Sequence, residues 1–126
     1  MDIAKLIPQL KQLGVELLIR FGSQVEGTAR PESDVDVGVL FSKNAPRNPR
    51  RYGTLYALLQ PLIPSARLDL IDLDEASYAL QFRAGAKGEL LFEATAMSFA
   101  DFRERAMLRY FDFQPILKIH EEALRV

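Results

Sequence analysis

The chain has 126 residues, a net charge of −1, 48% hydrophobic residues and no cysteine. This length suits one domain, so we expect residues 1–126 to form a single unit. The near-zero net charge gives no support to general electrostatic binding of nucleic acid or of a membrane surface. No apolar run approaches the roughly 18 residues that a membrane span needs, and the N-terminal segment lacks the features of a signal peptide. Because the absence of cysteine excludes disulfides and thiolate chemistry, we expect a cytoplasmic protein.

The first third of the chain predicts one helix and two strands. Residues 2–13 place their apolar side chains on one helical face, and Gly14 is the expected stop. The apolar run 15–21 predicts a strand that enters a tight turn at Gly22. After a polar loop, the alternating and β-branched segment 34–41 predicts a second strand.

The rest of the chain predicts further helices and strands in alternation. We expect helices over residues 50–60 and 74–85, the second stopping at Gly85, and strands over residues 66–73 and 88–94. From Ser98 onward the pattern is mostly helical, and Pro115 is expected to bend or interrupt that helix. These elements predict an α+β fold: a mixed sheet of about four strands with helices packed mainly on one face.

Two aspartates in the second predicted strand suggest a metal site. Residues i and i+2 of a strand point to the same face about 7 Å apart, so Asp34 and Asp36 should project together. Two carboxylates this close are unfavourable unless a cation lies between them or one of them is protonated. The only histidine is His120, so a metal bound here would be held by oxygen, and Mg2+ is the ion that this favours.

The third predicted strand supplies a further carboxylate. Asp69 lies between Leu68 and Leu70 on a strand that could neighbour residues 34–41, so we favour it as the third ligand. Asp72 falls on the opposite face at the strand end, where a turn-capping or helix-capping role explains it better.

The pair Gly22-Ser23 predicts a phosphate-binding turn. Glycine lets the backbone approach a ligand closely, and the following amides with the Ser23 hydroxyl can hold phosphate oxygens. Most Gly-Ser pairs after a strand are simply turns. The pair becomes informative because the two aspartates follow it at a defined distance.

Gly22-Ser23, ten intervening residues and then Asp34-Val35-Asp36 resemble the GSx10DxD signature of the minimal nucleotidyltransferases. These proteins belong to the DNA polymerase beta-like nucleotidyltransferase superfamily. The strand with Asp69, the "GELLFE" strand and the terminal "RYFDFQP" helix resemble the MntA-type antitoxins that are encoded beside HEPN-domain toxins. The resemblance covers nearly the whole chain and implies the minimal nucleotidyltransferase fold.

The resemblance implies a chemistry for these residues. Two Mg2+ ions would lie between Asp34, Asp36 and the triphosphate of ATP, and Asp69 would complete the ligand set and help to deprotonate the acceptor hydroxyl. Gly22 and Ser23 would hold the β- and γ-phosphates, and pyrophosphate would leave as AMP is transferred.

The resemblance also implies a partner. The expected acceptor is a tyrosine hydroxyl of a HEPN RNase toxin, which adenylylation would inactivate in a type VII-like toxin–antitoxin pair. We therefore expect a hetero-oligomer with the toxin and no direct binding of nucleic acid. Two alternatives are a non-catalytic antitoxin that acts by binding alone and a nucleotidyltransferase that modifies a small molecule.

Overall fold

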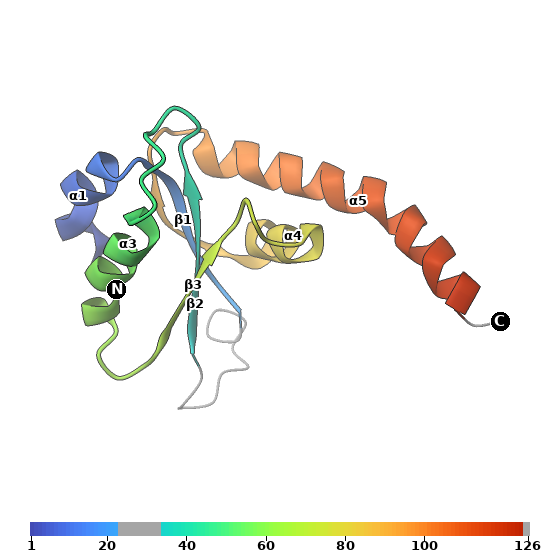
Figure 1. Cartoon of the computed structure of the whole chain (residues 1–126), viewed down its shortest axis with the longest axis horizontal. Coiled ribbons are helices and arrows are strands. Elements are labelled where there is room, and N and C mark those ends of the chain that lie inside the picture. Colours follow the sequence, from blue (N-terminus) through green and yellow to red (C-terminus); the bar gives the residue numbers. More distant parts are fainter. Residues whose placement is uncertain (23–33, 125–126) are drawn as a thin grey trace.

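A computed structural model describes residues 1–22 and 34–124, and this part of the chain contains one four-stranded sheet (Figure 1). The strands are β1 (Val15–Phe21), β2 (Val35–Phe41), β3 (Leu68–Asp72) and β4 (Glu89–Glu93). They lie in the order β3-β2-β1-β4; β1 is antiparallel to β2 and β4, and β2 is parallel to β3. The predicted mixed sheet is confirmed.

The helices precede, connect and follow these strands. They are η1 (Ile3–Leu6), α1 (Ile7–Gln12), α3 (Arg51–Leu59), η2 (Gln60–Leu62), α4 (Tyr78–Lys87) and α5 (Ser98–Leu124), of which η1 and η2 are 3-10 helices. None of the helices in the described residues is long and apolar enough to cross a membrane.

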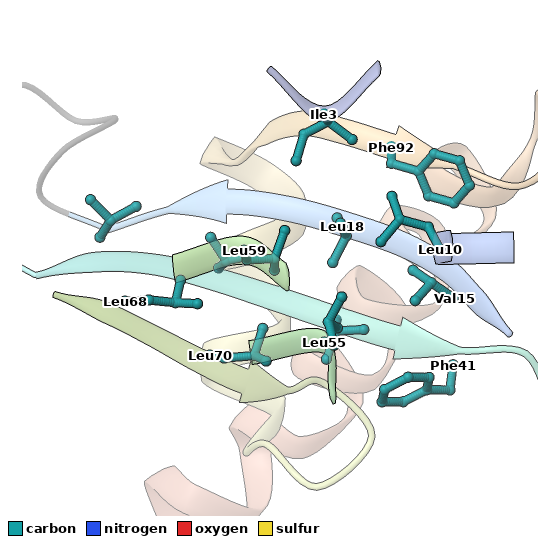
Figure 2. Packing of buried hydrophobic residues seen from close by; sticks show 13 residues of the cluster. Ile3, Leu10, Val15, Leu18, Phe41, Leu55, Leu59, Leu68, Leu70 and Phe92 are labelled. Carbon is teal, nitrogen blue, oxygen red and sulfur yellow. The ribbon is translucent and has the colours of Figure 1, made fainter. Parts of the chain in front are cut away.

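One face of the sheet packs against α1 and α3. Leu10 of α1 and Leu55 and Leu59 of α3 have no exposed surface, and they lie against Leu18 of β1 (Figure 2). The alternate residues of β2, beginning at Val35, point into the same cluster. This layer fixes the position of β2 relative to β1 and β3.

The opposite face packs against α4 and α5. Leu17 and Ile19 of β1 lie in a second buried cluster with Ala84 of α4 and with Phe102 and Ala106 of α5. Figure 1 shows α1 and α3 on one side of the sheet and α4 and α5 on the other. The expectation that helices cover mainly one face is therefore wrong, although the α+β class is confirmed. The physical reason is that β1 buries side chains on both of its faces, so each face requires its own layer of helices.

Helix α4 continues past the residue at which the sequence predicts its end. Gly85 lies inside the helix and is buried, because α5 packs so closely that a β-carbon there would lie 3.4 Å from Cα of Arg103. The helix instead ends at Lys87, and a β-carbon on Gly88 would collide with the carbonyl oxygen of Ala84 and with Ile19. Gly85 is thus a contact residue between helices.

Helix α5 continues through Pro115, so of the bend or interruption expected there, the interruption does not occur. A proline inside a helix removes one backbone hydrogen bond, but the helix can continue on both sides of it. The C-terminal part of α5 extends well beyond the sheet (Figure 1).

Replacing Gly85 by Leu should destabilise the fold by about 1–3 kcal/mol, because the larger side chain would push α5 away from α4. Urea unfolding of the purified variant measures this loss. The matched control is Gly53→Leu in α3, where a β-carbon would meet nothing within 4 Å. The control should be neutral or more stable by up to about 1 kcal/mol, since Leu favours a helix more than Gly does. Equal stability of the two variants would contradict the packing role of Gly85.

Candidate active site

Three strand ends meet at one end of the sheet. Because β2 is antiparallel to β1 and parallel to β3, β1 ends where β2 and β3 begin. The register places Phe21, the last residue of β1, opposite Asp36, and it places Asp36 opposite Asp69. Two of the predicted carboxylates are therefore direct neighbours across the β2–β3 pair.

Asp36 and Asp69 point to the face of the sheet that α4 and α5 cover. Their neighbours on the strands, such as Val35 and Leu70, lie in the cluster on the α1 and α3 face, and side chains alternate between faces. Asp36 is half-buried, Asp69 is exposed, and a hydrogen bond between the two carboxyl groups favours the protonated form of Asp36. The predicted convergence of Asp69 on Asp36 is thus present.

This neighbourhood changes the acidity of Asp36. The pKa of its carboxyl is raised from 3.8 to about 6, chiefly by burial and then, in decreasing order, by the negative charge of Asp69, the hydrogen bond to Asp69 and the charge of Asp34. The positive charge of Arg83 acts in the opposite direction. A site that raises the pKa of a carboxyl in this way is one that a cation would stabilise.

Asp34 lies at the margin of this pair. It directly precedes the first residue of β2 and is exposed, and its negative charge helps to raise the pKa of Asp36. Within residues 1–22 and 34–124, no three acidic, histidine or cysteine side chains come close enough together to hold a metal ion. The three-carboxylate metal site therefore stays a prediction, of which the structure supplies the Asp36–Asp69 pair.

Gly22 lies directly against Asp36. Its φ angle is +86°, a conformation that residues with a side chain rarely adopt, and a β-carbon there would collide with Oδ2 of Asp36. The sequence predicts that this glycine allows close approach of a ligand, whereas the structure shows close approach of the Asp36 carboxylate. Ser23, the other predicted phosphate-binding residue, lies outside the described residues.

Asp72 belongs to a turn at the other end of β3. Its Oδ1 accepts a hydrogen bond of 3.0 Å from the backbone N–H of Asp74, which is the capping role expected for it. In the register it lies opposite Val39, three residues along the strand from the Asp36–Asp69 pair. The choice of Asp69 over Asp72 agrees with this geometry.

Two residues near the carboxylates were not singled out from the sequence. Arg83 of α4 attracts the Asp36 carboxylate, and the Tyr52 hydroxyl of α3 donates a hydrogen bond to the carbonyl oxygen of Leu70 on β3. Burial raises the pKa of Tyr52, and the charge of Asp69 adds to the rise. No local pattern identifies these residues, because their role depends on which helix packs beside which strand.

Replacing Gly22 by Ala should destabilise the protein by about 1–2 kcal/mol from backbone strain alone, and the collision with Asp36 adds to this loss. The free energy of unfolding in urea measures the effect. Gly53→Ala in α3 is the control, because that position is open and its glycine is not among those with positive φ. A Gly22→Ala variant as stable as wild type would contradict the tight contact.

Replacing Asp36 by Asn should make the stability of the metal-free protein less dependent on pH. Because the pKa of Asp36 is raised on folding, its carboxyl stabilises the fold below pH 3.8, and this contribution is lost as the pH rises through about 6. A shift of this size corresponds to about 3 kcal/mol for a fully buried group, and the partial exposure of Asp36 reduces it to about 1 kcal/mol.

The measurement is urea unfolding with a chelator at about pH 4.5 and about pH 7.5, which bracket the folded-state pKa. The advantage of the Asp36→Asn variant over wild type should grow toward the higher pH. Asp112→Asn, at an exposed position of α5, should show no such growth. A constant difference between Asp36→Asn and wild type at both pH values would refute the expectation.

Comparisons with known proteins agree with this arrangement. Residues 4–96 match the family described as polymerase beta, nucleotidyltransferase, whereas a search of curated proteins finds no match. A chain from a crystal structure of a toxin–antitoxin with AMP-PNP is 23% identical, with a TM-score of 0.76 and 100% of both chains covered.

Two further solved structures share the fold. A chain from a complex of the tri-AMPylated HEPN toxin of Shewanella oneidensis with an MNT antitoxin is 21% identical, with a TM-score of 0.69, over 98% of this chain and 95% of that chain. A chain from the toxin–antitoxin MntA-HepT is also 21% identical with a TM-score of 0.69, over 98% and 96% of the two chains. The family match includes all four described strands together with Gly22, Asp34, Asp36 and Asp69. The chain therefore belongs to the polymerase beta nucleotidyltransferase family.

Proposed function

We propose that this protein is the antitoxin of a type VII-like toxin–antitoxin pair and transfers AMP from Mg-ATP to a tyrosine hydroxyl of a HEPN RNase toxin. The observation that carries the proposal is the Asp36–Asp69 pair beside Gly22 at one end of the sheet of a nucleotidyltransferase-family chain. The full-length likeness to chains of toxin–antitoxin structures, one with AMP-PNP and one with an AMPylated HEPN toxin, supports the nucleotide and the partner.

Asp34, Asp36 and Asp69 are the proposed ligands of two Mg2+ ions. The donor set fits these ions because all donors are carboxylate oxygens, and the raised pKa of Asp36 reflects negative charge that a cation would offset. When bound, Mg2+ neutralises charge on the triphosphate and activates the acceptor hydroxyl.

Two further roles in the reaction, phosphate binding and proton acceptance, belong to residues of the chain. Gly22 and Ser23 hold the β- and γ-phosphates through backbone N–H groups and the Ser23 hydroxyl. Asp69, which is exposed, accepts the proton of the acceptor tyrosine. A bond then forms between the tyrosine oxygen and the α-phosphorus, the bond from that phosphorus to the bridging oxygen breaks, and pyrophosphate leaves.

The exposure of the site favours a protein as the acceptor. Asp34 and Asp69 are both exposed, so a tyrosine on the surface of a partner protein in a hetero-oligomer can approach them. A neutral tyrosine that becomes an adenylate gains negative charge, which would repel RNA from a nearby RNase site.

Incubation with Mg2+, ATP labelled at the α-phosphate and the co-purified HEPN partner should place label on a tyrosine of the partner. An Asp36→Asn/Asp69→Asn variant should lose more than about 100-fold of the labelling rate, since even indirect partners of metal ligands typically contribute 10–100-fold. Asp101→Asn/Asp112→Asn, with the same charge change on exposed positions of α5, should label as wild type does. Autoradiography and mass spectrometry of the partner identify the modified residue.

Three outcomes would overturn the proposal. If the site variant labels the partner at the wild-type rate, the carboxylates are not the catalytic group. If no label transfers and the site variant still neutralises the partner, the protein acts by binding alone. If label appears on a small hydroxyl compound and never on the partner, the protein is a small-molecule nucleotidyltransferase.

A further inference from the structure

Helix α4 contains Arg83, a cation whose charge acts on the Asp36 carboxylate. In Figure 1, α4 lies on the same side of the sheet as α5 and nearer to the end at which β1 stops. This is the face to which Asp36 and Asp69 point. Arg83 is exposed, lies in the middle of α4, and is the one cation of the described residues that acts appreciably on Asp36.

The rotation of α4 about its axis is fixed by contacts on its other sides. Gln81 is buried, and its Nε2 donates hydrogen bonds to the carbonyl oxygens of Leu73, at 2.7 Å, and of Ala76, at 3.3 Å. Phe82 stacks on Tyr110 of α5, with ring centroids 4.5 Å apart. Successive residues on a helix are about 100° apart, so Arg83 leaves the helix on a different side from both Gln81 and Phe82.

A second arginine near this end of the sheet is directed elsewhere. Arg20 of β1 lies opposite Val37, whose side chain belongs to the cluster on the α1 and α3 face. It therefore projects away from the face on which Asp36 and Asp69 lie. Arg83, by contrast, belongs to a helix that packs on the face where the carboxylate pair lies.

We propose that Arg83 is a substrate-binding residue, and that its guanidinium binds non-bridging oxygens of the nucleoside triphosphate. This inference rests on the proposed nucleotidyltransferase function and adds a phosphate-binding residue to it. Mg2+ at the carboxylates would offset the negative charge that attracts Arg83 in the metal-free protein. The guanidinium would then face the triphosphate, whose oxygens match its planar, bidentate donors.

The test is direct binding, by calorimetry with Mg2+, of a non-hydrolysable ATP analogue and of tripolyphosphate, which contains only phosphate groups. Arg83→Ala should weaken both ligands about 10- to 100-fold, the range expected for losing hydrogen bonds to a charged group. Arg83→Lys should recover part of this loss, because it restores the charge without the planar donor pair. Arg109→Ala, at an exposed position of α5, should bind both ligands as wild type does.

Mn2+ binding is a second measurement. It distinguishes an Arg83 that binds phosphate from an Arg83 that only neutralises the carboxylates. Without nucleotide, removing the positive charge of Arg83 should strengthen Mn2+ binding at the carboxylates, whereas the affinity for the triphosphate should fall. If Arg83 only balanced the carboxylates, Mn2+ would bind more tightly and the two phosphate ligands would bind at least as well as before. That result would overturn the inference.

Two other results distinguish failure of the inference from failure of the proposed function. If wild type binds the ATP analogue and Arg83→Ala binds it equally well, only the inference is wrong. If wild type binds neither ligand, the nucleotidyltransferase proposal itself is wrong, and the inference is overturned with it. The melting temperature of each variant should stay near that of wild type, and a large decrease for Arg83→Ala alone would indicate a structural role instead.

Discussion

The contact between the carboxyl groups of Asp36 and Asp69 is the constraint around which this end of the molecule is built. The parallel register of β2 and β3 brings two carboxyl groups into direct contact, and burial of Asp36 together with the charge of Asp69 makes the charged form of Asp36 unfavourable. Such a pair persists because the surrounding packing holds it. Buried residues on both faces of β1 and β2 fix the strands, so the carboxyl groups cannot move apart by a shift of register.

The Asp36 carboxylate of this pair also restricts the residue type at position 22. Gly22 ends β1 in a left-handed conformation, and the Asp36 carboxylate occupies the space that a β-carbon would fill. Gly22 and the carboxylate on β2 are therefore one structural unit. Under the proposed roles of Gly22 in phosphate binding and Asp36 in metal binding, this contact would hold the two ligands in a defined relation, which an in-line displacement requires.

Helix α4 links the core to this unit. Gln81 anchors it to the end of β3, and Gly85 packs against α5, where a β-carbon would already be in contact with Arg103. Arg83 lies between these anchors and reaches the charge of Asp36. A helix that the sequence shows only as a connection between two strands thus also contributes to the electrostatics of the site.

The sequence by itself determined the strands and their order along the chain, and it identified Gly22, Asp34, Asp36 and Asp69 as candidate site residues, because alternation, glycine positions and short-range spacing are local properties. It also separated Asp69 from Asp72, since the face of a strand follows from its period. Tertiary structure alone decided that helices cover both faces, that Gly85 is a helix contact and Gly88 the end of α4, and that α5 continues through Pro115. It also brought Arg83 to Asp36. These features depend on which surfaces pack together across long separations in the chain, and no local pattern of residues encodes that.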